Sequence, residues 1–214
     1  LGRNAHDLLA HLGIDRAGLV RHATGGMLAI RCGLMYPEAA EQLVLVDPIG
    51  LEDWKALGVP SLSVNDWYAR ERRTTDASIR AYETEVYYAG MWKPAYEKWG
   101  QMRAGMYRGA GQDAVAGSSA RLYDMIYTQP VVYELGHLRV PTVLMVGDKD
   151  TTAIGRDAAP PQIRATLGQY PVLAKKTVAA IPASKLVEFP DLGHSPQLQD
   201  PDRFHKALLN ALAR

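Results

Sequence analysis

The chain has 214 residues, of which 47% are hydrophobic and 22% are charged, a balance typical of one globular domain or of a domain with a large insertion. Its net charge of +1 gives no electrostatic basis for binding nucleic acid or an anionic membrane surface. No stretch reaches the roughly 18 to 20 apolar residues of a membrane span. The single cysteine, Cys32, excludes an internal disulfide and is expected to be buried in an apolar helix.

The first fifty residues predict alternating helices and strands. A first helix precedes a short strand over residues 17–22, and a glycine pair then leads into a helix over residues 27–36 that Pro37 stops. The run "EQLVLVDP", residues 41–48, is apolar at both parities. Such a pattern is typical of a strand buried on both faces of a parallel sheet.

The middle of the chain differs from both ends. All four tryptophans and nine of the eleven tyrosines fall within residues 51–138, in segments that predict helices. A second doubly buried strand is predicted over residues 140–150. A helix-prone stretch over residues 160–181, a strand "SKLVEF" and a closing helix that begins at Asp200 and Pro201 complete the chain.

This alternation predicts an α/β fold with a mostly parallel sheet covered on both sides. In such folds ligands bind at the carboxyl ends of the strands. The loops expected there read, in chain order, "RHATGG", "DPIG", "GDKDTT" and "DLGHSP". The order is therefore a sharp turn, an acid and a histidine, each directly after a strand.

The order resembles the α/β-hydrolase family, in which a G-x-S-x-G elbow, an acid and a histidine follow one another along the chain. The resemblance spans essentially the whole chain. It implies the C-terminal half of the family core, formed by residues 1–50 and 139–214, with a helical cap inserted at residues 51–138. It further implies a serine hydrolase that transfers the acyl group of an ester to water.

Matched by position, the resemblance places Ala23 where the family keeps its nucleophilic serine, Asp150 as the acid and His194 as the general base. A serine hydroxyl needs an imidazole to take its proton and a carboxylate to orient that imidazole. The backbone N–H of Thr24 is the implied oxyanion-hole donor. Asp148 shares the loop of Asp150 and is the alternative acid, interpreted as a turn residue.

Other candidate residues receive weaker roles. His22 is expected to orient or pack within the elbow. Ser118 and Ser119, in "AGSSAR", are the alternative nucleophiles, although a helix N-cap or surface role is favoured for them. Four more histidines are expected on solvated surfaces without a role: His6, His11, His137 and His205.

Three departures from the family pattern bear on function. Ala23 has no hydroxyl, so no acyl-enzyme can form there. Arg21 replaces the first glycine of the elbow, where strand and helix pass closely, so a distorted elbow is expected. The family has four strands and a second oxyanion donor before the point at which this chain begins. The strand over residues 17–22 would then be an exposed edge that invites pairing with another chain.

The sequence therefore predicts an esterase-like hydrolase relative that is inactive or strongly impaired. The alternatives are a non-catalytic protein that binds an apolar ligand, and a fragment that acts only with a partner chain. Deliberate replacement of the serine explains Ala23 but not Arg21, whereas divergence explains both.

The aromatic residues of the predicted cap favour a small apolar or aromatic ester-like partner. Phosphate loops, dinucleotide fingerprints and clustered metal ligands are absent from the sequence, so no cofactor and no metal are expected. No targeting segment is recognised in the residues given, and the compartment is left open.

Overall fold

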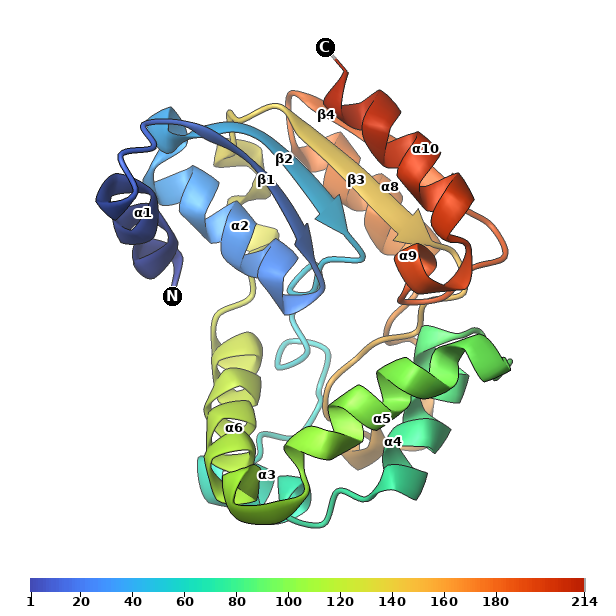
Figure 1. Cartoon of the computed structure of the whole chain (residues 1–214). Coiled ribbons are helices and arrows are strands. Elements are labelled where there is room, and N and C mark those ends of the chain that lie inside the picture. Colours follow the sequence, from blue (N-terminus) through green and yellow to red (C-terminus); the bar gives the residue numbers. More distant parts are fainter. Residues whose placement is uncertain (214) are drawn as a thin grey trace.

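The computed structural model describes residues 1–213, and its centre is a four-stranded parallel sheet (Figure 1). The strands lie in the order β1-β2-β3-β4, so each pairs with its neighbour in the sequence. Their bounds are β1 (Ala17–His22), β2 (Ala40–Val46), β3 (Thr142–Gly147) and β4 (Ser184–Phe189). The predicted parallel sheet is confirmed, and β1 and "SKLVEF" match their predicted bounds.

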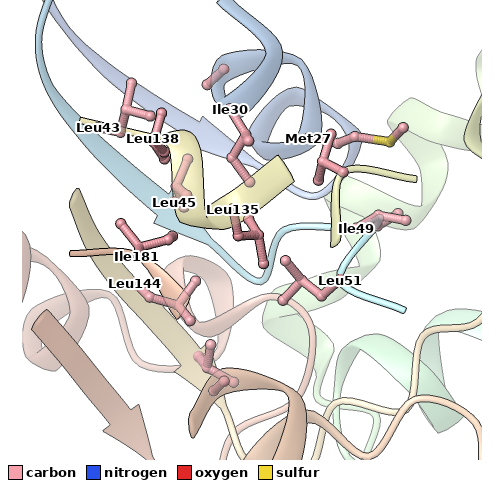
Figure 2. Close-up of a cluster of buried hydrophobic side chains, with 14 of the residues drawn as sticks. Met27, Ile30, Leu43, Leu45, Ile49, Leu51, Leu135, Leu138, Leu144 and Ile181 are labelled. Carbon is pink, nitrogen blue, oxygen red and sulfur yellow. The ribbon is translucent and has the colours of Figure 1, made fainter. Parts of the chain in front are cut away.

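Helices cover both faces of the sheet. On one face, α2 (Thr24–Met35) and α8 (Tyr170–Ala180) pack on the apolar side chains of β2 and β3. This buried cluster includes Met27, Ile30, Leu43, Leu45 and Leu144 (Figure 2). The opposite face is covered by α10 (Pro201–Leu212), whose Phe204 packs with the alternate valines of the strands. Because both faces are buried, β2 and β3 are apolar at nearly every position.

The remaining helices fall into two groups. Four of them follow β2 and precede β3, and the strands run toward the end of the sheet where these four lie (Figure 1). These are α3 (Val64–Glu71), α4 (Asp76–Tyr82), α5 (Glu97–Met106) and α6 (Gln112–Thr128), with a π-helical turn at Glu83–Tyr87. The others are α1 (Gly2–His11), α7 (Pro161–Arg164) and α9 (Pro196–Gln199). The division into a core and a separate cap stays a prediction.

Local sequence signals determine where several helices begin. The side chain of Ser63 accepts a hydrogen bond from the backbone N–H of Asp66 at 3.1 Å, and Asp66 caps the N–H of Ser63 in return. This reciprocal arrangement satisfies N–H groups that a helix start leaves without partners. At α10, Asp200 caps the backbone N–H of Arg203, and Pro201 occupies the first helical position, as the sequence predicts.

Two further expectations concern the surface. None of the helices in residues 1–213 is long and apolar enough to cross a membrane. Strand β1 lies at one end of the strand order in the described sheet. Pairing of that strand with another chain stays a prediction.

Candidate active site

The turn between β1 and α2 is a sharp strand-to-helix elbow with Ala23 at its apex. Ala23 has φ of 52° and ψ of −121°, a conformation that residues other than glycine rarely adopt. Its N–H donates to the carbonyl of Val46 at 2.9 Å, and its carbonyl accepts from the N–H of Ile49 at 3.2 Å and that of Gly26 at 2.9 Å. These bonds join the turn to the end of β2 and to α2, and thereby hold the strained backbone.

Helix α2 begins at Thr24, three residues before its predicted start, because both glycines lie in its first turn. A Cβ added to Gly26 would lie 2.7 Å from the Cβ of Pro48. The helix and the loop after β2 therefore pass too closely for a larger residue. Glycine is needed here for close packing, whereas the sequence pattern predicts the glycine pair as part of the turn.

Arg21 does not distort this elbow, contrary to expectation. Its side chain is exposed, and its guanidinium donates to the carbonyl of Val20 at 3.1 Å. The aliphatic part lies against Gly25, whose added Cβ would be 3.5 Å from the arginine Cδ. Because the long side chain leaves the turn toward solvent, the positive φ at Ala23 is retained.

The structure brings Asp150 and His194 together at the ends of β3 and β4. His194 Nδ1 and Asp150 Oδ2 lie 2.7 Å apart, and each residue is only 1% exposed. The other carboxylate oxygen accepts from the backbone N–H of Thr152 at 2.8 Å and from its hydroxyl at 2.6 Å. Since the carboxylate accepts from Nδ1, the Nε2 atom of His194 is left as the proton acceptor, which is the tautomer that a general base needs.

His22 lies beside this pair, on the strand residue directly before Ala23. Its ring centroid is 4.6 Å from that of His194, and its Nε2 donates to the carbonyl of His194 at 2.7 Å. Burial, followed by the neighbouring His194, lowers the pKa of His22 to about 4. His22 is therefore neutral near pH 7 and contributes packing and one hydrogen bond at the elbow.

We expect replacement of His22 by glutamine to change how stability depends on pH. As pH falls below about 6.5, the unfolded chain takes up a proton that the folded chain does not, so the unmodified protein loses stability down to about pH 4. The lowering of the His22 pKa from 6.5 to about 4 corresponds to a loss of at most about 3 kcal/mol in the free energy of unfolding. Urea unfolding across this range compares the two proteins, and His11→Gln at an exposed site controls for loss of an imidazole. A pH-independent difference for His22→Gln would contradict the expectation.

The π-helical turn covers the candidate histidine. The ring of Tyr87 lies 4.9 Å from that of His194 between centroids. The backbone N–H of His194 donates to the carbonyl of Val86 at 3.2 Å, and that of Ser195 donates to the carbonyl of Tyr87 at 3.3 Å. Sequence reasoning missed Tyr87, because the only signal was the aromatic composition of residues 51–138.

An arginine and a second tyrosine extend this aromatic surface. The guanidinium carbon of Arg103 lies 5.6 Å from the ring centroids of both Tyr82 and Tyr87. Its Nη1 lies 3.3 Å from a carboxylate oxygen of Glu83, which is almost fully buried. Tyr87, which contacts His194, is thus flanked by a second aromatic ring and by one cation that is already paired.

Burial and position test the expectations for the two serines and for the cysteine. Ser118 and Ser119 lie within α6 rather than at its start, so the N-cap interpretation was wrong. Ser118 is exposed and Ser119 is partly exposed, in agreement with the alternative surface role. Cys32 is buried as predicted. Within residues 1–213, no group of three histidine, cysteine or acidic side chains could hold a metal ion.

Comparison with known proteins identifies the family. The sequence pattern of the alpha/beta hydrolase family matches residues 2–207. The chain belongs to the alpha/beta hydrolase family. The fold class predicted from the sequence is therefore confirmed, and the sheet with its flanking helices is the architecture of that family.

Solved structures of similar proteins agree with this assignment. A probable hydrolytic enzyme from Pseudomonas aeruginosa PAO1 is 57% identical, with a TM-score of 0.97 over 100% of this chain and 69% of that chain. A hydrolase from the same organism is 18% identical, with a TM-score of 0.71 over 100% and 71% of the two chains. An esterase from Exiguobacterium antarcticum is 17% identical, with a TM-score of 0.69 over 100% and 72%. The last two show a shared fold.

Proposed function

We propose that this chain is an esterase-like member of its family whose acid and base are in place but whose nucleophile is missing. Asp150 and His194 act as acid and base, and Ala23 occupies the nucleophile position. The observation that carries the proposal is the buried 2.7 Å contact between Asp150 and His194, combined with the strained elbow at Ala23. Hydrolysis through an acyl-enzyme is consequently absent or strongly impaired.

The chemistry of the proposed site follows from these positions. A serine hydroxyl at position 23 would give its proton to Nε2 of His194, while Asp150 stabilises the imidazolium that forms. The N–H of Thr24, in the first turn of α2, has no partner within its own helix and is the proposed oxyanion donor. The methyl group of Ala23 offers no atom to bond to an acyl carbon. Loss of such a serine lowers turnover about a million-fold in a serine protease.

The proposed substrate or ligand is a small apolar or aromatic ester-like molecule. Residues 51–138 act as the cap in this proposal, and their tyrosines form the wall beside His194. Tyr82 and Tyr87 offer large apolar ring faces with polar tips, which suit an aryl or alkyl group. The positive charge of Arg103 is partly neutralised by Glu83, so the wall does not select strongly for an anion.

A fluorophosphonate probe tests the nucleophile position directly. We expect no covalent labelling of the unmodified chain at position 23, and stoichiometric labelling of that position in Ala23→Ser. The double variant Ala23→Ser/His194→Ala should label far more slowly, since its serine lacks a base. Robust labelling of the unmodified chain at another residue, read by peptide mass spectrometry, would show that the nucleophile has been misplaced.

A second candidate function is ligand binding without turnover. It is favoured by a fully buried Asp150–His194 pair that contacts His22, the residue directly before Ala23, whose methyl group cannot react. Calorimetric titration with an aryl ester should then show saturable binding, with the ester recovered intact by chromatography. Slow hydrolysis that His194→Ala abolishes would instead identify a residual enzyme.

A further inference from the structure

Asp47 is a second buried acid beside Asp150, and the proposed mechanism does not use it. It follows the last residue of β2, is 0% exposed and has φ of 41°. Its Oδ1 accepts a hydrogen bond from the backbone N–H of Gly147 at 2.8 Å, which joins the end of β2 to the end of β3. Its Oδ2 is buried, and no donor within residues 1–213 reaches it. An ionised carboxylate in this position would be costly.

The carboxylate of Asp150 has room for one more donor. A carboxylate offers about four lone-pair sites. Three donors are in place, namely His194 Nδ1 and both the N–H and the hydroxyl of Thr152. A hydroxyl hydrogen on Asp47 would occupy the remaining site and would also satisfy its own unpartnered oxygen.

The charges around Asp47 also favour its neutral, protonated form. Asp150 and Asp148, both from the loop after β3, are the charged groups that act on it. From α8, the phenol of Tyr170 donates to the carbonyl of Pro48 rather than to Asp47. Burial and, secondly, the charge of Asp150 raise the pKa of Asp47 well above its ordinary value, as expected for two neighbouring carboxyl groups.

We propose that Asp47 is held as a neutral carboxylic acid whose Oδ2–H donates to the Asp150 carboxylate and positions it against His194. The proton stays on Asp47, and no proton transfer is required. Asp47 is thus a positioning residue that acts through Asp150. Only the expected effect on activity rests on the proposed function of Asp150, because the proton on Asp47 can be measured without turnover.

Replacement of Asp47 by asparagine tests the bound proton. Asparagine keeps the acceptor for Gly147 and supplies an N–H toward Asp150, but it does not titrate. The unmodified protein retains a proton on folding that its unfolded chain releases above about pH 4, so it loses stability relative to the variant as pH rises. The ratio of the unfolding equilibrium constants, unmodified over Asp47→Asn, should rise about tenfold per pH unit, hence about a hundredfold between about pH 5 and about pH 7.

The matched control is Asp53→Asn. The pKa of Asp53 lies below its ordinary value, because hydrogen bonds from the Ala56 N–H and the Tyr133 hydroxyl outweigh the opposing effect of burial. The ratio of the unfolding equilibrium constants, unmodified protein over Asp53→Asn, should therefore be constant above about pH 5. A constant ratio for Asp47→Asn over the same range would overturn the proposal, because it would mean that Asp47 is ionised in the folded protein.

A second measurement covers the case in which Asp47→Asn fails to fold. In the unmodified protein labelled with ¹³C-aspartate, infrared spectroscopy should show a carboxylic-acid carbonyl band at about pH 7, and its absence would refute the proposal. In an Ala23→Ser background, Asp47→Asn should retain kcat while Asp47→Ala loses at least tenfold with little change in KM. Failure of Ala23→Ser itself to react would count against the proposed function and leave the infrared and unfolding outcomes decisive for Asp47.

Discussion

The Ala23→Ser variant is expected to hydrolyse aryl esters at least about 10⁴-fold faster than the unmodified chain. The elbow already holds position 23 at the positive φ of its apex, so a serine side chain needs no backbone change. The buried Asp150–His194 pair supplies a base with its tautomer fixed. The measurement is the initial rate on a panel of 4-nitrophenyl esters of increasing acyl length, compared with the unmodified protein at equal concentration.

Two further variants separate this interpretation from general surface reactivity. Ala23→Ser/His194→Ala should return to the rate of the unmodified chain, because the serine then has no proton acceptor. Ala23→Ser/Arg21→Gly should react as fast as Ala23→Ser, since the Arg21 side chain leaves the elbow toward solvent. A folded Ala23→Ser protein without hydrolysis and without probe labelling would rule out position 23 as the nucleophile site.

Gly147→Ala is expected to destabilise the protein strongly. An added Cβ would lie 2.1 Å from the carbonyl oxygen of Gly193 and 2.6 Å from that of Leu192. Both atoms belong to the backbone of the histidine loop, so no side-chain rotation relieves the clash, and the loop must move. We expect the free energy of unfolding to fall by about 3 kcal/mol, measured by urea denaturation.

The control for this substitution is Gly105→Ala in α5. No atom lies within 4 Å of the Cβ that would be added there, and the change in unfolded-chain entropy is the same in both variants. Gly105→Ala should therefore be neutral or stabilising by up to about 1 kcal/mol. Equal stabilities of the two variants would show that the approach of the β3 end to Gly193 is not tight in solution.

Strand positions and the residues that follow strands were predictable, because they depend on the local pattern of the sequence. β1 and β4 have the predicted bounds. Pro190 directly follows β4 and has no backbone N–H for a strand ladder, whereas the glycine pair at positions 25 and 26 follows β1 by two residues. Asp150 and His194 could be brought forward as candidate acid and base because they follow strands in a fixed chain order, and parallel strands bring their carboxyl ends to one edge. The choice of Asp150 over Asp148 agrees with the contact to His194.

Features that depend on contacts between distant segments were not predictable. The escape of Arg21 to solvent depends on the space outside Gly25, and the start of α2 depends on Pro48 passing close to Gly26. The packing of Tyr87 on His194 joins segments about a hundred residues apart. The isolated oxygen of Asp47 is visible only once β2 and β3 lie side by side. Apolar periodicity carries no information on any of these contacts.

The backbone N–H groups of His194 and Ser195 donate to the carbonyls of Val86 and Tyr87, and these two hydrogen bonds link the loop after β4 to the π-helical turn Glu83–Tyr87. A displacement of the π-helical turn would break these hydrogen bonds and would at the same time move the Tyr87 ring away from the His194 ring. We therefore expect solvent entry at His194 and loosening of the π-helical turn to occur in one opening event. Amide hydrogen exchange at His194 and Ser195 would report the frequency of that event.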